Sequence, residues 1–305
     1  VLGRVGRNES LRAMHLAWQS GMSLFETAPS YGFGEAESLL GGFLSGKRDR
    51  ITLVTKYGIE PQPLSRLKRI AIPAVRLSRR LGLPGVRHRW RRGSRGGAPQ
   101  GRFSVDGLRR SLDSSLRNLR TDYIDIFLLH DAGLDVVLRQ DMLGELELLA
   151  KAGKVIRTGL YAAPEVVAEA LSTKLDAMEY GFNPFALQTS ELCRAGDRGV
   201  FMMVNHPFQS ERHLTSVKSV LSLLSADETT PEPLRSKLRD AEWPVMLEVI
   251  FGLALHPAGA HAIVFSMMQK EHLLANIRAV DSNRFAPEEL SLIDRVLRKS
   301  VGRSI

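Results

Sequence analysis

The stretch SVDGLRRSLDSSLRNLRTDYIDIFLLHD, residues 104–131, joins the pattern of a helix to the pattern of a buried strand. Ser104 is a residue type that favours the start of a helix, and the pattern after it predicts a helix over 105–119. The run at 123–131 is largely apolar on both faces, as expected of a parallel strand that is covered on each side. The stretch therefore predicts a helix that leads into a strand of a parallel sheet.

The same alternation extends along most of the 305 residues. Further strands are expected at 22–28, 51–58, 155–161, 175–182, 199–208 and 260–266. Further helices are expected at 9–20, 35–46, 141–152, 164–172, 213–225, 244–256, 270–280 and 287–299. This order predicts a (β/α)8 (TIM) barrel as a single domain over 1–305, with residues 1–3 as the stub of a truncated first strand. A doubly wound sheet is the competitor, which is weakened because no Gly-x-Gly-x-x-Gly follows an early strand.

The net charge of +9 arises in one segment. Residues 61–105 hold twelve lysines and arginines and no acid, and the rest of the chain is slightly acidic. We interpret 60–103 as a long insertion in the loop after the strand 51–58, at the face where a barrel carries its active site. Three interpretations are open: a lid that favours an anionic substrate, a patch for acidic lipid or nucleic acid anchored by Trp90, or a solvated decoration. No nucleic-acid motif accompanies the arginines, so nucleic acid is not the expected partner.

Composition excludes several other classes of protein. No uncharged apolar run reaches the length of about 18 residues that a membrane span needs. Cys193 is the only cysteine, which excludes an internal disulfide or a thiolate zinc cluster and suits a cytoplasmic location. Arg194 beside it could lower the pKa of that thiol, although a packed cysteine is the more ordinary interpretation. The histidines show no metal-ligand spacing, so no metal site is expected.

Four polar side chains fall at the ends of successive strands. Glu26 lies near the end of the run 22–28 and Tyr31 follows that run, Lys56 lies near the end of the next strand, and His130 near the end of the one after it. Neighbouring parallel strands of a barrel place their carboxyl ends together, so we expect one pocket to hold all four. A turn at 29–32 and a structural ion pair of Glu26 are the alternatives that involve no chemistry.

This set of groups suits the reduction of a carbonyl group. As hydride reaches the carbon, the oxygen becomes an alkoxide and must be protonated. A tyrosine with its ordinary pKa of about 10 is a reluctant proton donor, and a nearby lysine favours the phenolate and lowers that pKa. A carboxylate such as Glu26 would hold the ammonium in place, and His130 could orient the carbonyl oxygen.

Three segments resemble successive signatures of the aldo-keto reductase family: FETAPSYGFGEAESLLGGFL at 25–44, VTKYG at 54–58 and SLDSSLRNLRTDYIDIFLLHD at 111–131. The resemblance implies a (β/α)8 barrel, NADPH as hydride donor and a tetrad of aspartate, tyrosine, lysine and histidine. It implies that Tyr31 is the general acid, that Lys56 tunes it and that His130 binds the carbonyl. Glu26 takes the role of the aspartate with one methylene more, which could misplace the carboxylate.

The cofactor side departs further from the pattern. Tyr161 and Ala162 stand where the family has Ser-Asn, and Glu179 stands where it has Gln. Asn205 or His206 occupies the region of an aromatic side chain that stacks on the nicotinamide. The segment VFSMMQKEHLLANIRAV at 264–280 resembles the adenine-phosphate segment, with Lys270 as the nearest cation for a 2′-phosphate. The resemblance thus implies cofactor contacts at Tyr161, Glu179, Asn205, Ser266, Lys270, His272 and Asn276.

The expected activity is NADPH-dependent reduction of an aldehyde or ketone, with a small carbonyl compound as substrate. A non-catalytic barrel that senses a nucleotide or binds a partner is the alternative from another class. A lyase or isomerase that uses Lys56 and Tyr31 without nicotinamide is the competing enzyme.

Overall fold

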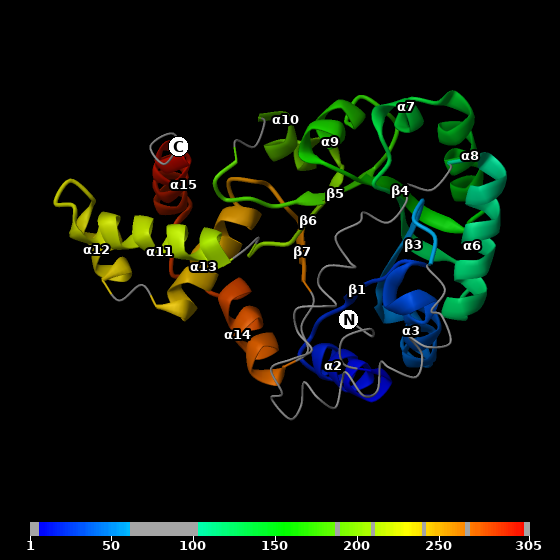
Figure 1. Cartoon of the computed structure of the whole chain (residues 1–305), viewed down its shortest axis with the longest axis horizontal. Helices are drawn as coiled ribbons and strands as arrows, with labels where there is room; N and C mark the ends of the chain where they lie inside the picture. Colours follow the sequence, from blue (N-terminus) through cyan, green and yellow to red (C-terminus); the bar gives the residue numbers. More distant parts are fainter. Residues whose placement is uncertain are drawn as a thin grey trace, which may run out of the picture. The chain divides into compact units, whose positions relative to one another are not determined.

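The computed structural model describes residues 6–61, 103–186, 190–208, 211–239, 242–265 and 269–301 (Figure 1). The chain divides into two compact units, which we describe separately. Unit 1 comprises Val1–Tyr161 and Ser266–Lys270, and unit 2 comprises Ala162–Phe265 and Glu271–Ile305. Residues 1–3, predicted as the stub of a first strand, and residues 62–102 of the insertion predicted at 60–103 lie outside the described residues, so the truncated strand and the role of the basic insertion stay predictions.

Unit 1 contains four parallel strands paired in chain order, β1 with β2, β2 with β3 and β3 with β4. Helices α3, α6 and α8 pack beside one another and against these strands. The elements of unit 1 are α2 (Arg7–Gln19), β1 (Leu24–Glu26), η1 (Tyr31–Gly34), α3 (Ala36–Leu44), η2 (Arg48–Arg50), β2 (Thr52–Tyr57), α6 (Val105–Leu119), β3 (Ile124–His130), α7 (Leu134–Val137), α8 (Gln140–Lys151) and β4 (Val155–Tyr161).

Unit 2 contains three parallel strands, with β6 between β5 and β7. Its helices α11 and α13 each pack on α15. The elements that follow β4 along the chain are α9 (Pro164–Ala170), β5 (Ala177–Gly181), α10 (Ser190–Cys193), η4 (Gly196–Arg198), β6 (Phe201–Asn205), α11 (Glu211–Ala226), α12 (Glu232–Leu238), α13 (Trp243–Leu255), β7 (Ala262–Val264), α14 (Lys270–Val280) and α15 (Pro287–Val301).

Local sequence explains why these elements form where they do. The Ser104 side chain accepts a hydrogen bond from the Gly107 backbone N–H at 3.1 Å, which satisfies one of the unpaired donors at the start of α6. The buried face of α6 repeats at helical spacing through Leu108, Leu112 and Leu119. Each observed strand lies within its predicted range, and all nine predicted helices are present among the described residues.

An ion pair on the outer side of unit 1 holds the starts of β2 and β3 together. Arg48 Nη2 lies 2.7 Å from Asp125 Oδ2, and the Leu53 backbone N–H donates to the same carboxylate at 2.9 Å. Asp125 is separated from His130 by an odd number of positions, so along a strand it faces the opposite side of the sheet. The carboxylate is therefore part of the scaffold of unit 1.

The register of unit 1 determines which side chains share the inner face. Ladder partners are Glu26 with Val54, Lys56 with Leu128, and His130 with Tyr161. Partners in a parallel ladder point to the same side, and so do residues two apart on one strand. One face of the sheet therefore carries Glu26, Lys56, His130 and Tyr161. Within the described residues, no helix combines the length and the hydrophobicity that a membrane crossing needs.

Candidate active site

The four predicted catalytic residues all belong to unit 1 and are joined by contacts. Glu26 is the last residue of β1, His130 is the last residue of β3, and Lys56 is the penultimate residue of β2. Tyr31 opens the short helix η1 that follows β1. The carboxyl ends of these strands therefore bring the predicted groups together.

Glu26 and Lys56 form a buried ion pair. Glu26 Oε1 lies 3.0 Å from Lys56 Nζ, and their side chains are 8% and 0% exposed. Glu26 thus pairs with the lysine, which is the role that the resemblance assigns to an aspartate, although its side chain is one methylene longer. A lysine removed from water needs such compensation because an isolated buried charge is very costly.

Tyr31 supplies the accessible edge of the site. Its side chain is 37% exposed, and its backbone N–H donates to Ala28 O at 3.0 Å. The Tyr31 ring meets the His130 ring edge-on, with centroids 5.9 Å apart and planes at 87°. A ligand that contacts the Tyr31 hydroxyl would therefore also lie near the imidazole.

His130 is held as a neutral imidazole. It is 5% exposed, and burial, followed by the positive charge of Lys56, lowers its pKa to about 3. Its Nδ1 has no hydrogen-bond partner among the described residues. A neutral imidazole keeps one N–H donor, so His130 can donate a hydrogen bond at any ordinary pH without carrying charge.

The lowered pKa of His130 predicts a specific pH dependence of stability. Between pH 6.5 and about 3 the unfolded chain binds a proton at this histidine and the folded chain does not, so stability falls as the pH is lowered. In His130→Gln, stability should fall by about 2 kcal/mol less than in the wild type between pH 7 and pH 4.5. Urea unfolding at the two pH values measures this difference. Parallel curves for the two proteins would contradict the burial of a neutral imidazole.

Tyr161, at the end of β4, contacts two of the four predicted catalytic residues. Lys56 Nζ lies over its ring, 4.3 Å from the centroid, and the His130 ring approaches it with centroids 5.5 Å apart. The sequence predicted Tyr161 on the cofactor side only. The sequence did hold a signal that could have placed Tyr161 in the cluster: it ends the predicted strand 155–161, just as the other predicted residues lie at the ends of their strands.

Two of the predicted cofactor residues meet in unit 2. Asn205 Nδ2 donates to Glu179 Oε1 at 2.6 Å, and Glu179 is wholly buried. Asn205 Oδ1 lies 2.7 Å from Nδ1 of the exposed His206. The backbone of His206 is in the left-handed conformation, with φ 50°. Because the amide N–H of Asn205 serves Glu179, its oxygen must accept, and His206 donates from Nδ1. Strand β6 thus presents an oriented imidazole at its end.

The remaining predicted cofactor residues lie on or beside α14. Lys270 and His272 are exposed in its first turn, whereas Asn276 is buried on the same side as Leu273. Ser266 lies outside the described residues. Asn276 therefore belongs to the packed side of the helix, and its contact with a cofactor stays a prediction.

For Cys193 the structure contradicts a thiol pKa lowered by Arg194 and agrees with the more ordinary interpretation of a packed cysteine. Burial raises the pKa of the Cys193 thiol, and this effect outweighs the positive charges of Arg298 and Arg194. No group of histidine, cysteine or carboxylate side chains suited to a metal ion occurs in the described ranges.

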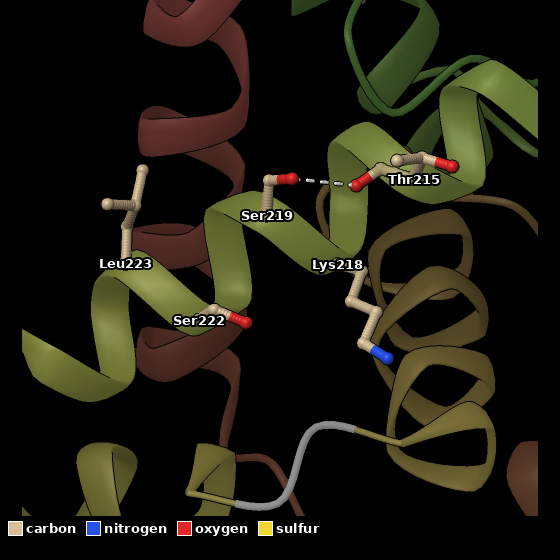
Figure 2. Close-up of a pocket in the computed structure, with 5 residues that line it drawn as sticks. All are labelled: Thr215, Lys218, Ser219, Ser222 and Leu223. Carbon is tan, nitrogen blue, oxygen red and sulfur yellow. Dashed lines mark hydrogen bonds between the residues drawn. The ribbon is translucent and has the colours of Figure 1, made fainter.

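A shallow hollow in unit 2 lies along α11 and does not offer a second active site (Figure 2). Its lining comes from one helix, and Ser219 Oγ donates to the Thr215 carbonyl within that helix at 3.0 Å. Among the described residues that line it, Lys218 is the only charged one, and none is a carboxylate or an imidazole. The candidate site is therefore the cluster at the strand ends of unit 1.

Comparison with known proteins agrees with this arrangement. The sequence model of the Aldo/keto reductase family matches residues 2–298. A D-threo-aldose 1-dehydrogenase from Pseudomonas sp. is 30% identical over 128 residues, which cover 41% of this chain and 34% of that protein. The matched stretch therefore spans about a third of that relative's length.

Solved structures show the same fold. An aldo-keto reductase from Bacillus halodurans in its holo form has a TM-score of 0.67 at 19% identity, covering 96% of this chain and 89% of that one. An aldo-keto reductase from Klebsiella pneumoniae in complex with NADPH has a TM-score of 0.62 at 22% identity, covering 97% and 88%. The predicted (β/α)8 barrel is confirmed. Since the family's sequence pattern extends over nearly the whole chain, this protein belongs to the aldo-keto reductase family.

Proposed function

We propose that this protein is an NADPH-dependent oxidoreductase that reduces an aldehyde or ketone to an alcohol, or catalyses the reverse oxidation. The observation that carries the proposal is the buried Lys56–Glu26 ion pair beside His130 and the partly exposed Tyr31. A phenol, an ammonium and a neutral imidazole at one set of strand ends are the groups that a developing alkoxide needs. The NADPH-bound relative from Klebsiella pneumoniae supports a nicotinamide cofactor.

The side chains of unit 1 have separate tasks in this mechanism. His130, neutral at working pH, donates a hydrogen bond to the carbonyl oxygen and orients it. When bound, NADPH supplies the hydride to the carbonyl carbon. Tyr31 gives its hydroxyl proton to the oxygen as negative charge develops there. Lys56 stabilises the phenolate that remains, and Glu26 keeps the ammonium in position.

Features of the chain suit the binding of NADPH. Lys270 is exposed at the start of α14, a helix of eleven residues whose first backbone N–H groups have no partner within the helix. A cation and a helix N-terminus together are a favourable setting for a 2′-phosphate. Glu179 and Asn205, joined by their hydrogen bond, are polar groups for the nicotinamide side. A cytoplasmic location and the carbonyl substrate stay expectations from the sequence.

A fluorescence titration with NADPH and, separately, NADH tests the proposal. Lys270→Ala should weaken NADPH binding about 10-fold and NADH binding less than twofold, because only NADPH carries the 2′-phosphate. Lys218→Ala, at an exposed lysine of α11 (Figure 2), controls for the general loss of one positive charge.

The outcomes separate the alternatives. Saturable NADPH binding with turnover of an aldehyde supports the oxidoreductase. Saturable binding without turnover of any aldehyde or ketone would favour the non-catalytic nucleotide-binding alternative. A Lys56 Schiff base trapped by borohydride, with no binding of either nucleotide, would favour a lyase or isomerase.

A further inference from the structure

Tyr161 joins the two halves of the catalytic cluster. On one side its ring face lies 4.3 Å from Lys56 Nζ, the atom that also pairs with Glu26 at 3.0 Å. On the other side the ring meets His130, which in turn meets Tyr31. The contacts thus form one continuous series from the carboxylate to the phenol, with Tyr161 in the middle.

The backbone of Tyr161 is fixed beside the histidine that its ring contacts. Tyr161 is the ladder partner of His130, and its carbonyl accepts a hydrogen bond from the Asp131 N–H at 2.7 Å. Asp131 follows β3 in the left-handed conformation, with φ 59°. Because both residues stand on paired strands, the backbone positions from which the two rings extend are fixed relative to each other.

The environment of Lys56 explains what this ring contributes. Lys56 is wholly buried, so its ammonium has lost its hydration shell. The face of an aromatic ring carries partial negative charge and attracts a cation, most strongly where water is excluded. Glu26 and the Tyr161 ring therefore both favour the charged form of Lys56. They also restrict the position of Nζ, which stands at the end of a flexible side chain.

We propose that Tyr161 is a positioning residue whose ring holds the Lys56 ammonium against Glu26 and fixes the His130 imidazole. This role differs from the cofactor contact that the sequence pattern implied for position 161. Its effect on turnover rests on the proposed function, whereas its effect on Lys56 does not.

Three variants separate the ring face from the other properties of Tyr161. Tyr161→Phe keeps the ring and removes the hydroxyl, Tyr161→Leu keeps an apolar side chain without a ring, and Tyr161→Ser introduces the small residue of the family pattern. We expect Tyr161→Phe to retain turnover within about threefold. Tyr161→Leu and Tyr161→Ser should lower kcat by about 5- to 30-fold, with the KM for NADPH changed less than twofold.

A second measurement reads Lys56 directly and needs no cofactor or substrate. In protein labelled with 13C and 15N at lysine, the Lys56 side-chain signal is the one that is absent from Lys56→Met. Its titration midpoint should fall by about half a unit to one unit in Tyr161→Leu and stay within about 0.2 units of wild type in Tyr161→Phe. Urea unfolding of each variant confirms that the compared proteins are folded.

The outcomes decide the proposal. Equal behaviour of Tyr161→Phe and Tyr161→Leu in the lysine titration would overturn it, because only the second variant lacks the ring. A raised KM for NADPH with unchanged kcat in Tyr161→Leu and Tyr161→Ser would also overturn it and assign Tyr161 to the cofactor. If the wild type shows no turnover while the titration behaves as expected, the positioning role stands and the proposed function fails.

Discussion

Replacing Tyr31 with phenylalanine should lower kcat for any accepted aldehyde or ketone by about 10²- to 10⁴-fold, the range typical of a lost general acid. The hydroxyl is the only group removed, and Tyr31 is 37% exposed, so the free energy of unfolding should change by less than about 0.5 kcal/mol. The edge contact of the ring with His130 is retained. Steady-state kinetics at saturating NADPH measures the loss, and nucleotide titration should give an unchanged Kd.

Tyr57→Phe is the matched control for Tyr31→Phe. Tyr57 follows Lys56 directly, so along β2 its side chain points to the opposite face. Its hydroxyl accepts a hydrogen bond from the Ser104 N–H at 3.1 Å, and its ring packs against Phe103. Losing that hydroxyl should cost about 1 kcal/mol of stability and leave turnover within twofold. If both variants lose turnover equally, the phenol of Tyr31 is not the proton donor.

The fold of this chain was largely predictable because its strands are apolar on both faces. Such runs separated by helical patterns leave few architectures open, and β4 and α6 begin and end where the sequence predicted. The helix α12 was not predicted. It has seven residues and buries only Leu234 and Leu238, so it offers a single i, i+4 pair and no longer periodicity.

The grouping of the candidate catalytic residues was predictable from chain order, but the distances between them were not. That Glu26, Lys56 and His130 end neighbouring strands follows from the alternation of elements. Whether the Glu26 carboxylate reaches the Lys56 ammonium depends on side-chain conformation, which the sequence does not determine. The structure shows that it does, at 3.0 Å. The contact of Tyr161 with Lys56 also required the register of β3 and β4, which local patterns do not determine.

Electrostatic effects were the least predictable part. The arginine beside Cys193 left a lowered thiol pKa open as the less ordinary interpretation, whereas burial dominates and raises that pKa. For His130, burial and the neighbouring charge of Lys56 act in the same direction, and together they lower its pKa to about 3. Charge neighbours can be found in a sequence, but desolvation depends on the packing around the group.

Lys56→Met should produce the second large effect, and on two quantities at once. Removing the ammonium leaves the Glu26 carboxylate, which is 8% exposed, without the cation 3.0 Å away. Breaking one side of a buried ion pair costs about 3–5 kcal/mol of stability at neutral pH. Turnover should fall by at least about 10²-fold, since the phenolate of Tyr31 loses its cation. Urea unfolding and steady-state kinetics measure the two losses separately.

The pH dependence identifies the cause of the stability loss in Lys56→Met. Protonation of Glu26 at acidic pH removes the uncompensated charge, so the deficit relative to wild type should narrow as the pH falls from 7 to 4.5. The pKa of His130 should also rise, because the charge of Lys56 is one of the two causes that lower it, and the variant then loses less stability in acid.

Two further variants complete the test of Lys56. Lys56→Met combined with Glu26→Gln should recover most of the stability and none of the turnover, because the pair is gone but so is the cation that the chemistry needs. Lys47→Met is the matched control: its ammonium lies over the Phe43 ring at 5.0 Å near the surface, and its loss should cost less than about 1 kcal/mol. If the double variant regains turnover with its stability, the ion pair serves only the fold, and the proton transfer to the carbonyl oxygen must depend on Tyr31 and His130 without it.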